Sequence, residues 1–597
     1  MSSLDRKHKG GSAGETALLA LLVAALIGVP AALYGLNTLS HKLVPRAEGL
    51  PADFWARALG TFTGALPWRS TEILLLIAAS VLLLALFVVF VVRSIRKGSR
   101  AVKHDRAAAR MASVKDVEPF TEKQVRAKAA RFGVDAPGVM IGRMVRGGNT
   151  LYASWEDTLL HIWGTRTGKT TTQAAPSIIE APGPVIATSN KRDLSDLTRD
   201  IRAEEGEVWV FDPQSVANEE PSWWWNPLSY VTDSERAAEM ANNFALGSRA
   251  VGAKGGDAYF DTAGKDLLAG LLLAAAVGKQ PIERVHTWLS RPTNDEAVRL
   301  LDEAGWVKEA DSVGGVIAAP DKQREGVYGT ARQMASCLKN EKIAAWVNPT
   351  GPGDRRPQFV PEDFVRGKNT LYALSKEGAG TAGPLVTSLT VASATAAEEY
   401  AVTQRGGRLV IPMVCVLDEA ANVCRWGNLP DLYSHYGSRG IVVSTFLQSW
   451  SQGVDVWGES GMKKLFSTAN VFTYGGNVKE EQFLKMLSDL IGQYRYTSVS
   501  TSRQKGGSSS SRQDSTDDIL SVADLAALPK GRAVMLGSGA RAVLLRTVQV
   551  SDRPYADKVA ASEAARNRPR PITAGLTGEP TPAGASGGNR WSAMAGE

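Results

Sequence analysis

The sequence is poor in cysteine and carries little excess charge. Its 597 residues include three cysteines, Cys337, Cys415 and Cys424, which are too few and too widely spaced for a disulfide framework or a zinc site. The formal charge of +7, from 68 Lys and Arg against 61 Asp and Glu, is mild for this length and alone indicates neither nucleic acid nor anionic lipid as a partner. No recognition-helix motif that would read bases is present. These features exclude a disulfide-rich secreted domain and fit a main body in a reducing cytosol.

Two long apolar runs lie near the N-terminus. Residues 16–36 and 73–92 each lack charged side chains over about 20 residues, which is enough for a helix to cross a hydrocarbon core about 30 Å thick. A cleaved signal peptide is the alternative for the first run, but no small-x-small cleavage site follows it. Basic residues precede the first run and crowd the far end of the second, so both termini are expected in the cytoplasm. We therefore predict that residues 1–95 anchor a multi-pass protein in the inner, cytoplasmic membrane.

A Gly-Lys-Thr segment follows an apolar stretch at residues 158–163. In such a turn, backbone N–H groups, a helix N-terminus and one lysine surround a polyphosphate. Lys169 is expected to hold the β- and γ-phosphates of ATP, and Thr170 to bind Mg²⁺. An ordinary helix start is the alternative reading of this segment. The predicted nucleotide-binding residues are Gly164, Thr165, Arg166, Thr167, Gly168, Lys169, Thr170 and Thr171.

A second segment, at residues 414–420, is an apolar strand that ends in two carboxylates. This pattern suits an inner strand that brings Asp418 to the magnesium shell and Glu419 to the attacking water. A structural Asp-Glu pair is the alternative. The two segments, in this order and each after a plausible strand, together favour nucleotide binding.

One position departs from the usual phosphate loop. Counting back from Gly168, the place of the loop's first glycine is taken by Trp163, and Gly164 comes one residue later. That glycine normally allows the tight turn out of the strand. Either Gly164 takes over the turn, or the loop is altered and hydrolysis is weak.

The cytoplasmic part alternates strands and helices, which predicts an α/β fold with a mostly parallel sheet. Strand patterns fade from residue 234 to about 342, where Ala/Leu periodicity predicts an all-helical insertion. Three tryptophans at 223–225 suit either a base-stacking platform or a buried turn before a proline. The Ser-rich stretch 497–516 reads as an exposed loop or an edge hairpin. The predicted parts are a basic juxtamembrane connector at 96–147, helical over 93–135, a nucleotide-binding domain at 148–233 and 343–553, the insertion at 234–342, and a disordered tail at 554–597.

The order of these segments resembles the TraG/TraD-type coupling proteins of conjugative type IV secretion systems. The resemblance covers roughly residues 10–550 and depends on the combination of motifs, because none of them is specific alone. Its features are the two N-terminal spans, the phosphate loop, the 211–213 and 225–228 segments, the helical insertion, the acidic strand at 417–420, the segments 428–430 and 438–441, Gln448, Gln452, and the closing segment 519–529.

The resemblance implies a RecA-like P-loop NTPase that works as a homo-hexamer below the membrane. It would receive a relaxase-bound single strand of DNA from the relaxosome and pass it to the secretion channel, through sequence-independent phosphate contacts. By motif match, Asp418 coordinates the metal, Glu419 is the general base and Gln448 senses the γ-phosphate. Arg439 is the candidate for an arginine supplied to the ATP of a neighbouring subunit, with a surface arginine near glycines as the alternative.

Three other functions fit parts of the pattern. An FtsK-type pump for double-stranded DNA is also membrane-anchored, but the chain has no long Pro/Gln-rich linker and no winged-helix pattern after residue 550. A membrane receptor for the relaxosome that hydrolyses little ATP is suggested by Trp163. A coupling ATPase for protein effectors shares every motif, so the sequence does not separate it from a DNA motor.

Overall fold

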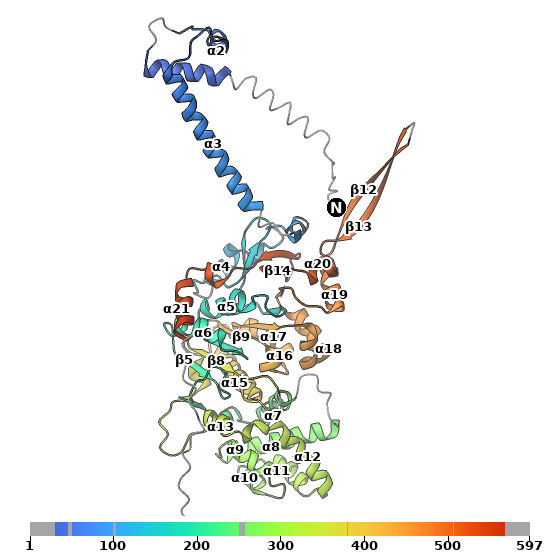
Figure 1. Ribbon diagram of the computed structural model, residues 1–597. Helices are drawn as coiled ribbons and strands as arrows, with labels where there is room; N and C mark the ends of the chain where they lie inside the picture. Colours follow the sequence, from blue (N-terminus) through green and yellow to red (C-terminus); the bar gives the residue numbers. More distant parts are fainter. Residues whose placement is uncertain are drawn as a thin grey trace, which may run out of the picture. The chain divides into compact units, whose positions relative to one another are not determined.

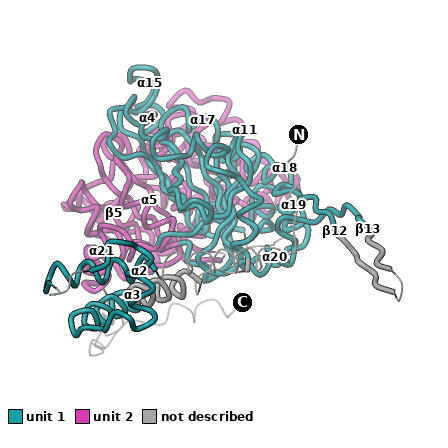
Figure 2. Tube along the Cα trace, turned by 90° about the horizontal axis from the view of Figure 1, so that it is seen from above, with its two compact units in different colours: residues 1–169, 249–254, 397–548 teal, residues 170–248, 255–396, 549–597 magenta. Residues whose placement is uncertain are grey.

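The computed structural model describes residues 30–45, 50–98, 103–249, 257–378, 380–504 and 507–566. The chain divides into two compact units, drawn in different colours in Figure 2. Unit 1 comprises residues 1–169, 249–254 and 397–548, and unit 2 comprises residues 170–248, 255–396 and 549–597. We describe each unit by itself.

Unit 1 contains a mixed sheet with the strand order β2-β1-β15-β14-β11-β3-β10-β9. The last four strands of this order run parallel and are buried along their whole length, which explains their unbroken apolar sequences. The other four pair in antiparallel fashion. The strands are β1 (Val139–Met144), β2 (Thr150–Ala153), β3 (Leu159–Ile162), β9 (Met413–Leu417), β10 (Ile441–Leu447), β11 (Val471–Tyr474), β14 (Arg532–Gly537) and β15 (Val543–Arg546).

Five helices and a long hairpin complete the C-terminal part of unit 1. The Ser-rich stretch forms β12 (Gln493–Gln504) and β13 (Gly507–Asp518), which pair with each other as a separate two-stranded sheet. Figure 1 shows this ribbon extending away from the end of α19. It is therefore a hairpin, but not at the edge of the main sheet. The helices are α16 (Ala420–Val423), α17 (Leu429–Arg439), α18 (Trp450–Thr468), α19 (Glu481–Ile491) and α20 (Val522–Ala526).

The N-terminal part of the described chain is helical. Residues 30–43 form a helix, followed by α2 (Phe54–Phe62) and α3 (Ser70–Gly98). The second apolar run, 73–92, falls within α3, whereas residues 16–29 of the first run lie outside the described residues. Among the described residues, no helix combines the length and the apolar composition that crossing a membrane requires.

The connector predicted at 96–147 is not simply helical. It contains the short helices η1 (Lys103–Ala109), η2 (Glu118–Phe120) and α4 (Glu122–Ala130), and its last part is β1, which pairs with β15. Asp105 accepts two hydrogen bonds from the Arg532 guanidinium, at 2.7 and 2.9 Å. The sheet thus begins before residue 148, because the partner strand that completes β1 lies some 400 residues further along the chain, beyond the reach of local periodicity.

Unit 2 contains a parallel sheet with the order β4-β8-β5. Beside it, Trp223 packs edge-on against Trp209 and Trp346 and also contacts Phe359. Trp223 and Trp225 are buried, so the three tryptophans do not form an exposed stacking platform. The elements are η3 (Thr170–Ala174), α5 (Ala175–Ile179), β4 (Val185–Ser189), α6 (Asp193–Arg202), β5 (Val208–Phe211), β6 (Trp224–Trp225), η4 (Pro227–Tyr230), β7 (Gln358–Phe359), α14 (Pro361–Phe364), β8 (Thr370–Leu374) and, up to residue 396, α15 (Gly383–Thr403).

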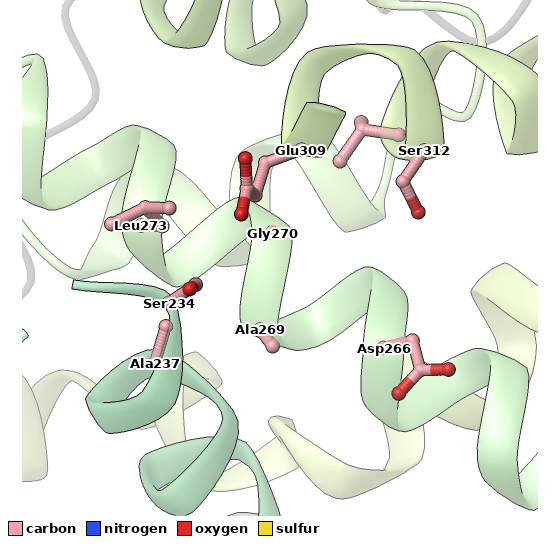
Figure 3. Close-up of a pocket in the computed structure, with 9 residues that line it drawn as sticks. Ser234, Ala237, Asp266, Ala269, Gly270, Leu273, Glu309 and Ser312 are labelled. Atoms are coloured by element: carbon pink, nitrogen blue, oxygen red, sulfur yellow. The ribbon is translucent and has the colours of Figure 1, made fainter. Parts of the chain in front are cut away.

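Between η4 and β7 the described part of unit 2 is helical. Helix α8 packs against α7 and α12 and buries its leucine-rich middle. A small cavity of about 120 Å³ lies among α7, α8 and α11, and Figure 3 shows Asp266 and Glu309 among the residues that line it. The helices are α7 (Ser234–Ser248), α8 (Ala258–Val277), α9 (Glu283–Leu289), α10 (Glu296–Glu303), α11 (Val307–Ile317), α12 (Asp321–Met334), η5 (Ser336–Lys339) and α13 (Glu341–Val347).

The first part of the predicted disordered tail is folded. After η6 (Val550–Asp552), residues Ala556–Arg566 form α21, which packs against α6. Ser562 donates a hydrogen bond to the Asp196 carbonyl at 2.6 Å, and Arg566 pairs with Asp200 at 2.5 Å. The prediction of disorder from residue 554 is therefore wrong up to Arg566, because these contacts supply a partner that the polar, Ala-rich sequence does not reveal. Residues 567–597 lie outside the described residues.

Candidate nucleotide site

The predicted phosphate loop leaves an inner strand of the unit 1 sheet. It follows β3, which runs parallel between β10 and β11. Arg166 and Gly168 have left-handed backbones, with φ of 60° and 94°, and the Thr167 hydroxyl donates to the Gly164 carbonyl at 2.7 Å. The chain therefore turns sharply at the carboxyl end of β3, the edge at which parallel α/β sheets bind ligands.

The acidic pair lies at the same edge of the sheet. Strand β9 ends at Leu417, so Asp418 and Glu419 directly follow a fully buried strand. Glu419 has a left-handed backbone, with φ 53° and ψ 43°, and precedes α16. A left-handed glutamate costs free energy and persists where the surroundings hold it in place. The strain at Glu419 is the kind found at functional sites.

Lys169 joins the two motifs. Its Nζ atom lies 3.1 Å from Oδ1 of Asp418 and forms an ion pair with Oε1 of Glu419. All three side chains are mostly buried, with exposed fractions of 14%, 6% and 3%. Burial disfavours the charged ammonium, but the two carboxylates outweigh it and raise the pKa of Lys169 above its ordinary value. The two carboxyl side chains thus favour the cationic form of Lys169.

Gln448 completes this cluster from the next strand. It directly follows β10, which lies between β3 and β9, and its side-chain amide donates to Oε2 of Glu419 at 2.7 Å. Its backbone N–H donates to the Gln452 side chain at 2.9 Å. Three neighbouring parallel strands therefore bring Lys169, Gln448 and the acidic pair into one hydrogen-bonded cluster.

Arg439 lies elsewhere in unit 1. It ends α17, and its Nη1 atom donates to the Gly407 carbonyl at 2.7 Å. Arg439 precedes β10 and Gln448 follows it, so a seven-residue strand of about 20 Å separates their sheet edges. Within this chain Arg439 does not join the Lys169 cluster, and its role toward a neighbouring subunit stays a prediction.

The last predicted nucleotide-binding residues belong to unit 2. Thr170 and Thr171 begin η3, a π-helical turn that leads into α5. The Thr171 hydroxyl donates to the Gln549 side chain at 2.6 Å. A cavity of about 520 Å³ in unit 2 is lined by Thr170, Thr171, Gln549, part of α6 and part of α21.

Trp163 does not leave a gap in the loop. Its indole is buried, and Gly164 follows without a left-handed backbone. Gly164 is needed for space instead, because a Cβ atom there would overlap the carbonyl oxygen of Asn477. Of the two alternatives for this position, a tight turn made by Gly164 is therefore not what the structure shows, since this glycine permits a close backbone contact rather than an unusual φ angle.

The residues available for a metal match Mg²⁺. Asp418, in unit 1, offers a hard oxygen ligand, and Mg²⁺ commonly binds one or two protein oxygens together with phosphates and water. Among the described residues, no group of three or more His, Cys, Asp or Glu side chains could hold a metal ion by itself. The donor set thus fits an ion that arrives with a nucleotide, and the roles of Thr170 and Asp418 as its ligands stay predictions.

The sequence did not single out Asn477 or Gln549 as site residues. The Gly-Gly-Asn at 475–477 is an ordinary turn signal after β11, and its left-handed Gly476 and Asn477 fit that reading. Nothing local connects this turn, or Gln549, with a loop more than 300 residues earlier.

Comparison with known proteins finds similar sequences and a similar fold. A family model described as the TraM recognition site of TraD and TraG matches residues 412–530, which include Asp418, Glu419, Arg439 and Gln448. The type IV secretion system-coupling protein VirD4 of Bartonella quintana (strain Toulouse) is 21% identical over 355 residues, which cover 57% of this chain and 53% of the relative. The chain thus matches about half the length of that curated protein.

The fold is similar to a solved structure. The bacterial conjugative coupling protein TrwBdeltaN70, in an unbound monoclinic form, superposes with a TM-score of 0.50 at 16% identity, covering 70% of this chain and 90% of the other. This likeness concerns the fold alone, and the RecA-like NTPase activity stays a prediction. The family model, the curated relative and the fold together confirm the resemblance and support a type IV coupling protein.

Proposed function

We propose that this protein is an ATP-driven DNA translocase of the inner membrane, which couples a relaxase-bound single strand to a type IV secretion channel during conjugation. The carrying observation is the cluster in which Lys169 lies between Asp418 and Glu419, with Gln448 bonded to Glu419. The names of the relatives, a type IV coupling protein and a conjugative coupling protein, support the process.

The cluster suits phosphate transfer. When nucleotide phosphates attract the Lys169 ammonium, the two carboxylates lose their cation and become available for other contacts. Asp418 and Thr170 would hold Mg²⁺, which supplies charge stabilisation for the phosphates when bound. Glu419 then orients and deprotonates the attacking water, while Gln448, already bonded to Glu419, responds to the γ-phosphate.

The remaining parts of the proposal concern assembly and cargo. The two apolar runs would anchor the chain, with both termini and the motor in the cytoplasm. A homo-hexamer would allow Arg439 to serve the ATP of a neighbouring subunit, since a site completed across an interface gains several orders of magnitude in rate from such an arginine. DNA would be held through its phosphates, so binding should weaken with salt and show no sequence preference.

A mating assay tests the proposal. Donor cells carry the parent, Lys169→Ala or the control Lys485→Ala, which removes an exposed lysine paired with Asp489 on α19. We expect all three proteins in the membrane fraction, parental plasmid transfer with the control, and no transfer with Lys169→Ala. Parental transfer by Lys169→Ala would overturn the motor. Secretion of a reporter-fused effector without plasmid transfer, in the parent, would favour the protein-exporting alternative.

A further inference from the structure

The first half of the phosphate loop lies on the turn that follows β11. Three hydrogen bonds join the two segments: Gly475 N–H donates to the Ile162 carbonyl at 3.2 Å, Gly164 N–H to the Gly476 carbonyl at 3.0 Å, and the Asn477 side-chain amide to the Thr165 carbonyl at 2.9 Å. They follow one another along the loop. The turn thus continues the β3–β11 pairing past the ends of both strands.

The two backbones are also in direct contact. A Cβ atom on Gly475 would overlap the Cδ2 atom of the Trp163 indole, and one on Gly164 would overlap the Asn477 carbonyl. Gly475 does not have a left-handed φ, so its lack of a side chain matters for space. The bulk at Trp163, where a glycine is usual, is therefore matched by the missing bulk at Gly475.

Polar contacts hold the indole in place. The Nε1 atom of Trp163 donates to the Thr473 hydroxyl at 2.8 Å, and that hydroxyl lies 2.6 Å from Nδ1 of His161. The Thr473 hydroxyl thus accepts from the indole and forms a second hydrogen bond with the His161 ring. Burial lowers the pKa of His161 to about 3, so the ring is neutral, and it stacks on Phe446. These contacts hold the Trp163 indole in its observed orientation.

Asn477 combines two properties that the contact requires. Its backbone is left-handed, with φ 58°, a conformation that asparagine tolerates better than most residues. Its amide reaches the carbonyl of Thr165, which belongs to the peptide before the left-handed Arg166. A carbonyl held from outside fixes the orientation of that peptide, and hence of the N–H group of Arg166, which is one of those that can meet a phosphate.

From these contacts we infer that Gly475, Gly476 and Asn477 are positioning residues for the phosphate loop, and that Trp163 and Gly475 act as a matched pair in place of the usual first glycine. The inference depends on the proposed nucleotide function of the loop. The turn touches no reacting group itself. It acts by holding the Ile162–Thr165 backbone in the form that receives phosphate.

The first test uses Asn477→Gly in the full-length, detergent-solubilised protein. This change keeps the left-handed backbone and removes only the amide, and Asn218→Gly makes the same exchange at another left-handed asparagine. We expect Asn477→Gly to weaken binding of a fluorescent ATP analogue about three- to tenfold, the range for one lost hydrogen bond, with a melting temperature like that of the control. Equal affinity in the two variants would overturn the role of Asn477.

The second test is a double-mutant cycle on the matched pair. Gly475→Ala should reduce ATP affinity more than tenfold, because its Cβ atom displaces the indole. Adding Trp163→Gly, which restores the usual glycine, should recover affinity relative to Gly475→Ala alone. Losses that add independently would contradict the pairing.

Lys169→Ala separates the two claims. If it binds the analogue as tightly as the parent, the proposed nucleotide site is wrong. If it loses binding while Asn477→Gly binds as tightly as Asn218→Gly and the losses from Gly475→Ala and Trp163→Gly add independently, only the positioning role is wrong.

Discussion

Removal of the Lys169 ammonium should strongly destabilise β9, even in nucleotide-free protein. Lys169→Ala leaves Asp418 and Glu419 buried beside each other without their cation. Breaking a buried ion pair by removing one partner typically costs about 3–5 kcal/mol. The loop would also lose its phosphate ligand, so stability and nucleotide binding should fail together.

The repulsion can be estimated from the structure. Both carboxylates contact one ammonium, one of them at 3.1 Å and the other more closely, so their nearest oxygens lie within about 6 Å of each other. Two unit charges at about 6 Å in an effective dielectric of about 20 repel by roughly 3 kcal/mol. Neutralising one of them in the double variant Lys169→Ala/Glu419→Gln should therefore recover much of the loss.

Hydrogen–deuterium exchange of the β9 amides measures this locally. A loss of about 3 kcal/mol corresponds to more than 100-fold faster exchange, since about 1.4 kcal/mol is tenfold. We expect that acceleration in Lys169→Ala, at most about tenfold in the double variant, and none in Lys485→Ala, whose ion pair is exposed. Unchanged β9 exchange in Lys169→Ala, or a double variant that exchanges as fast as the single one, would refute the electrostatic account.

Three further predictions follow from the same contacts. Glu419→Gln should bind ATP but release no phosphate, measured as retained nucleotide after gel filtration, and parental turnover would disqualify Glu419 as the base. Because the pKa of Lys169 is raised above 10.5, its stabilising effect should be complete below about pH 10.5 and lost at higher pH; the melting temperatures of parent and Lys169→Ala should therefore differ by a constant amount from pH 8 to 9.5 and converge only above about pH 10.5, and convergence already at pH 8 would contradict the assignment. Deleting residues 556–597 should lower the melting temperature relative to deletion of 567–597 alone, since only the first removes the contacts of α21 with α6, and equal temperatures would show that α21 adds no stability.

The central strands were predictable because each has a short apolar run in its own local sequence. The apolar runs before Trp163, Asp418 and Gln448 are short, uncharged and bounded by turn residues, and this pattern predicts an inner strand in each case. Parallel strands place their carboxyl ends on one edge, and the prediction that Lys169, Asp418 and Glu419 work together needed no more than that rule.

Contacts between distant segments were not predictable. The polar helix α21 lacks an apolar stripe of its own, and its stability depends on Asp196 and Asp200 of α6. Likewise the sequence around β1 gave no local sign of a strand, because β1 is stabilised by pairing with the distant strand β15. The matched bulk of Trp163 and Gly475 joins positions 312 residues apart, and a glycine that is needed for space looks the same in sequence as one needed for a turn.

ATP hydrolysis by the full-length protein, with and without single-stranded DNA and beside Lys169→Ala, tests the central claim most directly. The account predicts turnover that single-stranded DNA stimulates, that salt suppresses through lost phosphate contacts, and that Lys169→Ala abolishes. Turnover that persists in Lys169→Ala, or a folded, oligomeric parent that binds ATP and hydrolyses none with DNA present, would contradict a DNA motor built on this site.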